Sequence, residues 1–194
     1  DSDDALELAD KLGGFINRIA WDESGKLAEE RGPFPEYQNS ALHKKGMPPV
    51  RNSSVITIAP TGTISRISGC SSGIEPLFSL CYHKHNILEG ESLLYIDSNF
   101  ERMAREQGFY SDELMEYLAD GGSIQDRDDV PSSVKDIFVT SGDISPEYHV
   151  RMQAVFQESV DAAISKTINF PNSATRNDVR TAYMLAWELG CKGI

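Results

Sequence analysis

The sequence predicts an α/β fold built from parallel βαβ units. Continuous apolar stretches at 54–59, 77–87 and 165–170 are typical of strands that are buried on both faces of a sheet. Between them lie segments whose apolar residues recur every three or four positions, as in amphipathic helices. With 194 residues, 40% of them hydrophobic, the chain can build one substantial core, so we expect a single unit over residues 1–194.

The N-terminal segment is predicted to form one long helix, from Ser2 to about Arg31. Ser2 is a favoured N-cap residue, three aspartates lie at the positive end of the helix dipole, and Gly13-Gly14 is expected to weaken or bend the helix. Apolar residues recur on one face at Leu8, Leu12, Phe15, Ile16 and Ile19. Residues 32–52 hold four prolines and two glycines without periodicity, so we expect an ordered loop there.

The middle of the chain is predicted to contain two strands and several short helices. A strand at Ser54–Ala59 ends in a Pro-Thr-Gly-Thr turn that opens a short helix, and a second strand covers Leu77–Ile87. Three short helices are then expected to form an excursion on the surface, at 98–107, 111–119 and 131–139.

The C-terminal third continues the alternation of helix and strand. Ser145 followed by Pro146 is typical of a helix start, and Thr175 with Asp178 resembles a capping box. Pro171 is expected to close a strand. The predicted elements are a helix from 145 to about 163, a strand at 165–170, a helix from 175 to 190, and the start of a further strand at 192–194.

Charge and hydropathy exclude two classes of partner. The formal net charge is −12, from 30 acidic and 18 basic residues, and no basic stripe is present, so a nucleic-acid-binding surface is not expected. No apolar run approaches the roughly 20 residues that span a bilayer. The N-terminus also has neither the basic region nor the apolar region of a signal peptide, so we expect no membrane association and a cytoplasmic location.

The cysteines and histidines predict neither a disulfide framework nor a metal site. Cys70, Cys81 and Cys191 are an odd number without CxxC spacing, so we expect reduced and mostly buried thiols. His83 and His85 would point to the same face of a strand, but two histidines alone are a weak basis for a metal site.

The turn after the first strand is the candidate binding site, because the carboxyl ends of strands are where α/β folds bind ligands. The first-turn amides of Gly62, Thr63, Ile64 and Ser65 would be unsatisfied donors, the helix dipole favours an anion, and Gly62 allows close approach of a phosphate. The segment matches neither a Walker A loop nor a Rossmann fingerprint, and a plain turn with an N-cap remains an alternative. Glu75 lies in a nearby Gly-Pro loop as either a site carboxylate or a solvated turn residue. The candidate phosphate-binding residues are Pro60, Thr61, Gly62, Thr63, Ile64 and Ser65.

Four stretches of the sequence together carry a resemblance to a known family. They are ERGPFP at 30–35, RNSSVITIAPTGTISRISGCSSGIEPLFSL at 51–80, AISKTINFPN at 163–172 and AYMLAWELGCKGI at 182–194. In this combination and order they resemble the catalytic subunit of ribonucleotide reductase, specifically its adenosylcobalamin-dependent class II form. The resemblance implies a ten-stranded α/β barrel, of which this chain would be the C-terminal half. It also implies that the loop at 60–65 binds the diphosphate or triphosphate of a substrate ribonucleotide.

The same resemblance implies a radical mechanism whose central residue this sequence lacks. The family forms a thiyl radical on a cysteine within an Asn-Pro-Cys motif followed closely by Glu, and no such motif occurs here, so no catalytic residue is assigned. We therefore expect a fragment or split-gene product, with the N-terminal half of the barrel and a dithiol reductant such as thioredoxin as partners. Two alternatives stay open, namely a fragment of a class I large subunit and a non-catalytic phosphate- or nucleotide-binding module.

Overall fold

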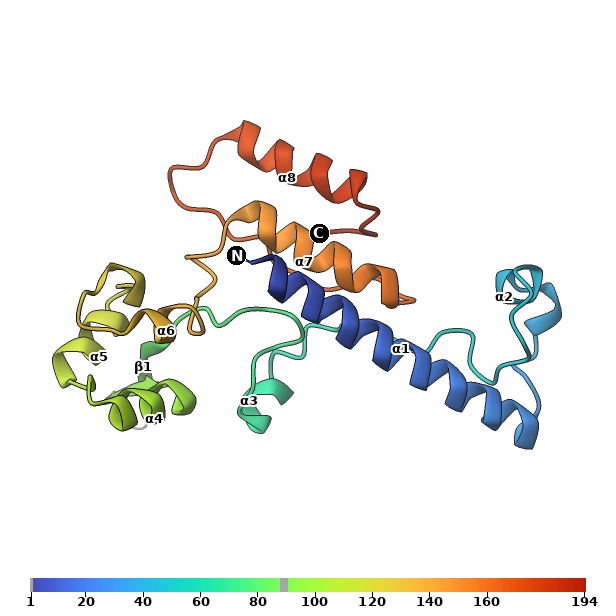
Figure 1. The fold of residues 1–194 in the computed structure, drawn as a ribbon, viewed down its shortest axis with the longest axis horizontal. Coiled ribbons are helices and arrows are strands. Elements are labelled where there is room, and N and C mark those ends of the chain that lie inside the picture. Colours follow the sequence, from blue (N-terminus) through green and yellow to red (C-terminus); the bar gives the residue numbers. More distant parts are fainter. Residues whose placement is uncertain (1, 88–90) are drawn as a thin grey trace.

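The computed structural model describes residues 2–87 and 91–194. Figure 1 shows α1, α7 and α8 side by side, with β1 and α4–α6 clustered beyond one end of α1 and α2 at its other end. The elements are α1 (Asp3–Arg31), η1 (Tyr37–Asn39), α2 (Ala41–Lys44), α3 (Ile64–Ser68), β1 (Cys81–Ile87), β2 (Glu91–Ile96), α4 (Ser98–Gln107), α5 (Asp112–Ala119), η2 (Ile124–Asp126), α6 (Ser132–Lys135), α7 (Pro146–Ser159) and α8 (Arg176–Glu188).

The long N-terminal helix is confirmed, and glycine allows it to approach α7 closely. The Ser2 side chain caps α1 by accepting a hydrogen bond from the Ala5 amide at 3.2 Å. A Cβ on Gly13 would lie 3.2 Å from the Cβ of Ser159 in α7. Asn17 Nδ2 donates to the Ser159 carbonyl at 2.8 Å, so the two helices are joined at the point of closest approach.

The apolar stripe of α1 is exposed, and a different face of the helix is buried. The buried residues of α1 are small, namely Ala9, Gly13, Ser24 and Ala28. The five large apolar residues of the stripe are 46–66% exposed, from Ile16 at the low end to Leu8 at the high end. Periodicity thus correctly predicted a helix, whereas small residues form its buried face.

Residues 77–138, the middle block, have their own core, around which a hairpin and short helices pack. Buried residues of this core include Leu80, Cys81, Phe100, Leu114 and Met115. The predicted single strand at 77–87 is corrected to a hairpin in which β1 pairs antiparallel with β2. The second strand, Glu91–Ile96, was missed because its short apolar run lies next to helical segments and strand pairing is not visible in local periodicity.

Two further predicted strands are corrected to extended segments. Residues 54–59 and 165–170 form no continuous ladder: one parallel bridge joins Ile58 to Ile164. The Ser165 amide donates to the Ile58 carbonyl at 2.9 Å, so the pairing is parallel as predicted. Ile58 is only half-buried, and residues 192–194 form no strand either.

A carboxylate explains why the pairing along 54–59 is so short. Asp161 accepts hydrogen bonds from the amides of Val55 and Ile56, at 2.7 and 3.0 Å. These amides are therefore satisfied by a side chain instead of a neighbouring strand. The same region ends α7 at Ser159 instead of about residue 163, because Gln157 Nε2 donates to the carbonyls of Val160 and Ala162.

The remaining helices agree with prediction in type and differ in some of their bounds. Helices α4, α5 and α8 begin and end within one or two residues of the predicted positions, each with a side-chain N-cap. Helix α6 is shorter than predicted, and η1 and α2 add helical turns to the ordered loop at 32–52. In the described part of the chain, no helix is both long and apolar enough to cross a bilayer.

We expect the 194 residues, expressed alone, to self-associate through the exposed stripe of α1, because contiguous exposed apolar side chains favour association. Light scattering after size exclusion should give a mass above that of the monomer at high concentration. The double variant Phe15→Gln/Ile19→Gln should lower that mass, whereas Glu7→Gln, in an exposed ion pair with Lys11 on the same helix, should not. A wild-type chain that stays monomeric at all concentrations would contradict the expectation.

Candidate functional site

The backbone of the loop at 60–65 is unusual at its second residue. Thr61 has φ = 47°, and in residues 2–87 and 91–194 it is the one non-glycine residue with positive φ. This left-handed conformation is unfavourable for a β-branched residue, and such strain is concentrated at functional sites. Helix α3 begins directly after the loop, at Ile64, and its N-cap Thr63 makes no side-chain capping hydrogen bond.

The loop presents backbone donors without partners. Among the described residues, the amides of Gly62, Thr63 and Ile64 find no acceptor, nor do the hydroxyls of Thr61 and Thr63. Nothing lies within 4 Å of a Cβ built on Gly62, so the space above it is open. The predicted cluster of unsatisfied first-turn amides is therefore present in three of four positions.

The fourth predicted amide, that of Ser65, is already used. It donates to the Thr61 carbonyl at 3.0 Å, which closes the turn. Its side chain is buried and lies beneath the loop, with the Ser65 and Ser72 hydroxyl oxygens 2.8 Å apart. The Cys70 amide also donates to the Ser65 carbonyl at 3.0 Å, so Ser65 connects the loop to the turn that follows α3.

That following turn, residues 72–75, is fixed from both sides. The Glu75 amide donates to the Ser72 carbonyl at 2.9 Å. Gly73 has φ = 53°, and a Cβ there would lie 3.0 Å from Ile58 Cγ2, so the turn packs against the end of the segment at 54–59. Glycine satisfies both the conformation and the close contact.

Glu75 is partly buried and both of its carboxylate oxygens are paired. Its Oε2 accepts from Lys166 Nζ at 2.8 Å, and its Oε1 accepts from the Thr167 amide at 2.6 Å. The Lys166 side chain is 1% exposed and that of Glu75 24% exposed. The solvated reading of Glu75 was therefore wrong. Lys166 was not predicted as a site residue. The sequence did hold one indication of its role, because a lysine inside a predicted buried strand needs a partner.

Lys166 also contacts a buried histidine. Its Nζ lies 2.9 Å from His149 Nδ1 and 2.7 Å from the Thr167 carbonyl. His149 Nε2 lies 3.1 Å from the carbonyl of Ser141, which can only accept, so Nε2 carries the proton and Nδ1 accepts from Lys166. The three acceptors around Nζ require three N–H groups, which assigns Lys166 as an ammonium ion.

Burial shifts the titration of both buried bases. Desolvation lowers the pKa of His149, and the neighbouring Lys166 charge lowers it further. Desolvation likewise lowers the pKa of Lys166, against the opposing effect of Glu75. The geometry therefore holds a neutral imidazole beside a charged, paired ammonium group.

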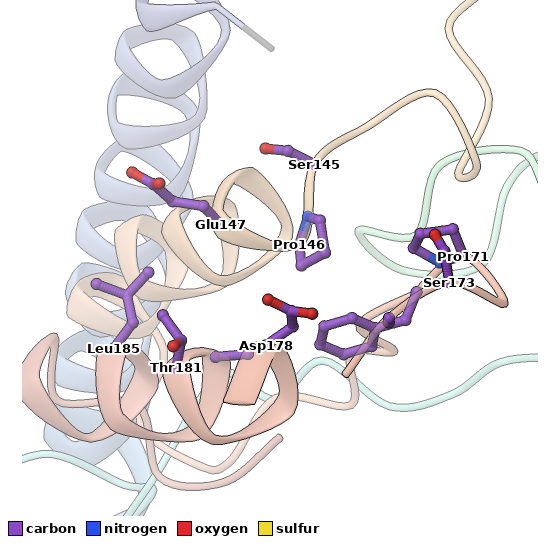
Figure 2. Close-up of a pocket in the computed structure, with 11 residues that line it drawn as sticks. Ser145, Pro146, Glu147, Pro171, Ser173, Asp178, Thr181 and Leu185 are labelled. Carbon is purple, nitrogen blue, oxygen red and sulfur yellow. The ribbon is translucent and has the colours of Figure 1, made fainter. Parts of the chain in front are cut away.

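A separate hollow lies between the first turns of α7 and α8 and the segment with Pro171 and Ser173, as Figure 2 shows. Its volume is about 380 Å³. Both acidic residues that line it are engaged: Asp178 accepts from the Thr175 amide and hydroxyl, at 2.7 and 2.8 Å, in a capping box, and Glu147 pairs with Arg151. Because the start of α8 is capped by its own side chains, this hollow offers fewer available donors than the loop at 60–65.

The histidines of the hairpin and the cysteines supply no further site. His83 and His85 stack on one face of β1 as predicted, with ring centroids 6.0 Å apart. Within the described ranges, no group of three or more metal-ligating side chains is present. Cys81 is buried and desolvation raises its pKa to about 12, whereas Cys70 is exposed, which corrects the expectation of mostly buried thiols.

Comparison with known proteins now identifies the family. The family model described as the ribonucleotide reductase barrel domain matches residues 47–194. The chain belongs to the ribonucleotide reductase family. The predicted partial α/β barrel is thereby confirmed as the fold class.

Two curated relatives and one solved structure extend the match over the whole chain. The vitamin B12-dependent ribonucleoside-diphosphate reductase of Thermoplasma acidophilum is 48% identical over 191 residues, which cover 98% of this chain and 24% of the relative. The protein of the same name from Mycobacterium tuberculosis is 43% identical over 194 residues, which cover 100% of this chain and 27% of the relative. The class Id ribonucleotide reductase alpha subunit of Actinobacillus ureae aligns with a TM-score of 0.81 and 26% identity, covering 100% of this chain and 34% of that one. The chain thus spans about a quarter of the length of these curated relatives.

The buried His149 predicts a stability that depends on pH. Because the pKa of His149 is lowered in the folded state, the unfolded state takes up a proton first as the pH falls below about 6.5. The contribution of neutral His149 to the free energy of unfolding is therefore fully present above that pH. It is lost as the pH falls toward the lower, folded-state pKa, by at most about 1.4 kcal/mol per pH unit. We expect His149→Gln to flatten the fall in melting temperature between about pH 7.5 and 5.5.

The control for this measurement is His43→Gln, which replaces an exposed histidine on α2. It should leave the slope of melting temperature against pH as in the wild type. Identical slopes for wild type and His149→Gln would show that His149 does not titrate in this way.

Proposed function

We propose that this chain supplies the substrate-phosphate site of a reductase that converts ribonucleotides to deoxyribonucleotides, and that Pro60, Thr61, Gly62, Thr63, Ile64 and Ser65 form that site. The observation that carries the proposal is the set of three unpartnered amides, at Gly62, Thr63 and Ile64, at the start of α3. Amides at a helix start donate to phosphate oxygens and lie at the positive end of the helix dipole. The Thr61 and Thr63 hydroxyls add donors, while Ser65 fixes the loop from below.

We further propose that residues 1–194 are the C-terminal portion of the catalytic barrel domain and act with the remaining part of a reductase. The family match over 47–194 and the quarter-length coverage of the relatives support this arrangement. The 194 residues contain no Asn-Pro-Cys motif, so in this proposal the radical cysteine comes from outside them. A ribonucleoside diphosphate or triphosphate is the substrate, and a dithiol such as that of thioredoxin is the reductant.

The proposed cofactor of the complete enzyme is adenosylcobalamin, in line with the names of the relatives from Thermoplasma acidophilum and Mycobacterium tuberculosis. Neither the buried His149 nor the hollow between α7 and α8 has groups free to hold it. The ring nitrogens of His149 contact Ser141 and Lys166, and the hollow between α7 and α8 has capped helix ends. We therefore propose that cobalamin contacts lie elsewhere in the enzyme and assign no step to the cofactor here. A cytoplasmic location is proposed on the same family grounds.

Two alternatives carry specific support. The solved class Id alpha subunit matches in fold over the whole chain, which keeps a class I large subunit as a candidate, although the identity of 26% is well below the 43–48% of the B12-dependent relatives. The second alternative is a non-catalytic nucleotide-binding module, which would keep the loop at 60–65 and need no Asn-Pro-Cys motif. Reductase activity of the full-length polypeptide with and without adenosylcobalamin would separate the three.

Gly62→Val is expected to weaken binding of a ribonucleoside diphosphate to the full-length reductase by at least about tenfold, because a branched side chain would occupy the space over the free amides. The substitution should not perturb the fold, since no atom lies within 4 Å of a Cβ at Gly62 and its φ is not positive. Cys70→Ser, at an exposed position near the loop, is the matched control and should bind as the wild type. Equal binding by wild type and Gly62→Val in calorimetry would remove the phosphate role of the loop.

The 194 residues alone are expected to show no ribonucleotide reduction with adenosylcobalamin and a dithiol, because the radical cysteine and its neighbours are not among them. Adding a separately expressed polypeptide that carries the Asn-Pro-Cys half of the barrel should restore measurable turnover. Turnover by the isolated chain would mean that Cys70, Cys81 or Cys191 performs the radical chemistry.

A further inference from the structure

The buried Lys166 lies outside the proposed phosphate loop but is connected to it through a short series of contacts. Its ammonium group is held by three acceptors: a Glu75 oxygen at 2.8 Å, His149 Nδ1 at 2.9 Å and the Thr167 carbonyl at 2.7 Å. All three N–H groups are thus used, so the ammonium group has one defined position.

Lys166 fixes the turn at 72–75 through Glu75. Both oxygens of this carboxylate are engaged, one by Lys166 Nζ and the other by the Thr167 amide at 2.6 Å. These bonds cross 91 and 92 residues of sequence, so they attach the turn to a distant segment. Charge-assisted bonds of this kind are stronger than neutral ones, and stronger still where water is excluded.

The turn at 72–75 contacts the loop at 60–65. The Ser72 hydroxyl lies 2.8 Å from that of Ser65, and the Ser65 amide closes the loop onto Thr61 at 3.0 Å. Helix α3 has five residues and no side-chain N-cap, so little within the helix itself orients its first amides. The contacts of Ser65 with Thr61, Gly62 and Ser72 therefore contribute to the orientation of those amides.

We propose that Lys166 is a positioning residue for the phosphate loop, acting through its ion pair with Glu75. The inference rests on the proposed function of that loop. Lys166 does not itself reach a substrate, because its side chain is 1% exposed and all its donors are occupied. Its effect is on the orientation of the Gly62, Thr63 and Ile64 amides, and therefore on the part of the substrate that carries phosphate.

The experiment measures binding of a ribonucleoside diphosphate and of the matching ribonucleoside to the full-length reductase by calorimetry. Lys166→Met keeps the length of the side chain and removes its charge. It is expected to weaken diphosphate binding by about tenfold and to change ribonucleoside binding by less than about twofold. A merely structural role would weaken both ligands alike, so equal losses, or no loss, would overturn the proposal.

A second variant separates positioning from stability. Lys166→Met leaves the Glu75 carboxylate without its cation, which destabilises a partly buried site. The double variant Glu75→Leu/Lys166→Met removes both charges, so it should melt close to the wild type while keeping the selective loss of diphosphate binding. If the single variant does not fold, the double variant alone decides, and wild-type diphosphate binding by it would refute the positioning role.

Two further variants test whether any loss of binding is specific to Lys166. Arg127→Met breaks an ion pair with Asp129 in the middle block, 2.8 Å long, and should change the binding of neither ligand. Gly62→Val in the same assay distinguishes the two proposals. If Gly62→Val weakens diphosphate binding and both Lys166 variants do not, only the positioning role fails; if Gly62→Val also binds normally, the phosphate loop itself is refuted, and the positioning role with it.

Discussion

A buried ammonium ion is stable only if its charge is compensated and each of its N–H groups finds an acceptor. In this chain that constraint draws three separate parts together at Lys166: the turn that carries Glu75, the helix that carries His149, and the extended segment of Lys166 itself. The connection continues through His149 to the Ser141 carbonyl, while the Ser141 amide donates to the Leu77 carbonyl at 2.8 Å. One buried charge therefore connects α7, the middle block and the turn at 72–75 that contacts the loop at 60–65.

The same need to satisfy polar groups accounts for the sparse strand pairing. Segments 54–59 and 165–170 meet through a single parallel bridge, and Asp161 takes the two amides that a longer ladder would use. Parallel strands in a barrel have neighbours on both edges, whereas these two have one bridge between them. The end of the segment at 54–59 lies beside the turn at 72–75, where a Cβ on Gly73 would lie 3.0 Å from Ile58 Cγ2.

The sequence was most informative where structure is set by local chemistry. Helices α4, α5 and α8 were predicted almost to their bounds because Asp97, Ser111 and Thr175 cap them and a glycine follows each of the three within two residues. The loop was also found locally, from an apolar run that ends in threonines and a glycine. By contrast, β2, the packing face of α1 and the pairing of Glu75 with Lys166 depend on residues far apart in the chain. No periodicity records a contact across 91 residues, and a lysine in an apolar stretch signals only that some partner exists.

The charge distribution is consistent with phosphate recognition by backbone dipoles. A net charge of −12 repels anions at long range, and Lys166, the one buried lysine or arginine among the described residues, is neutralised by Glu75. Residues 60–65 themselves offer only neutral amides and hydroxyls, and the interaction of such groups with a phosphate depends on precise orientation more than on net charge. Orientation is therefore the property on which the site depends, and the strained Thr61, the buried Ser65 and the turn held by Glu75 each restrict it. A rigid support built around a compensated charge suits this requirement, because it would fix the proposed phosphate loop without adding a net charge beneath it.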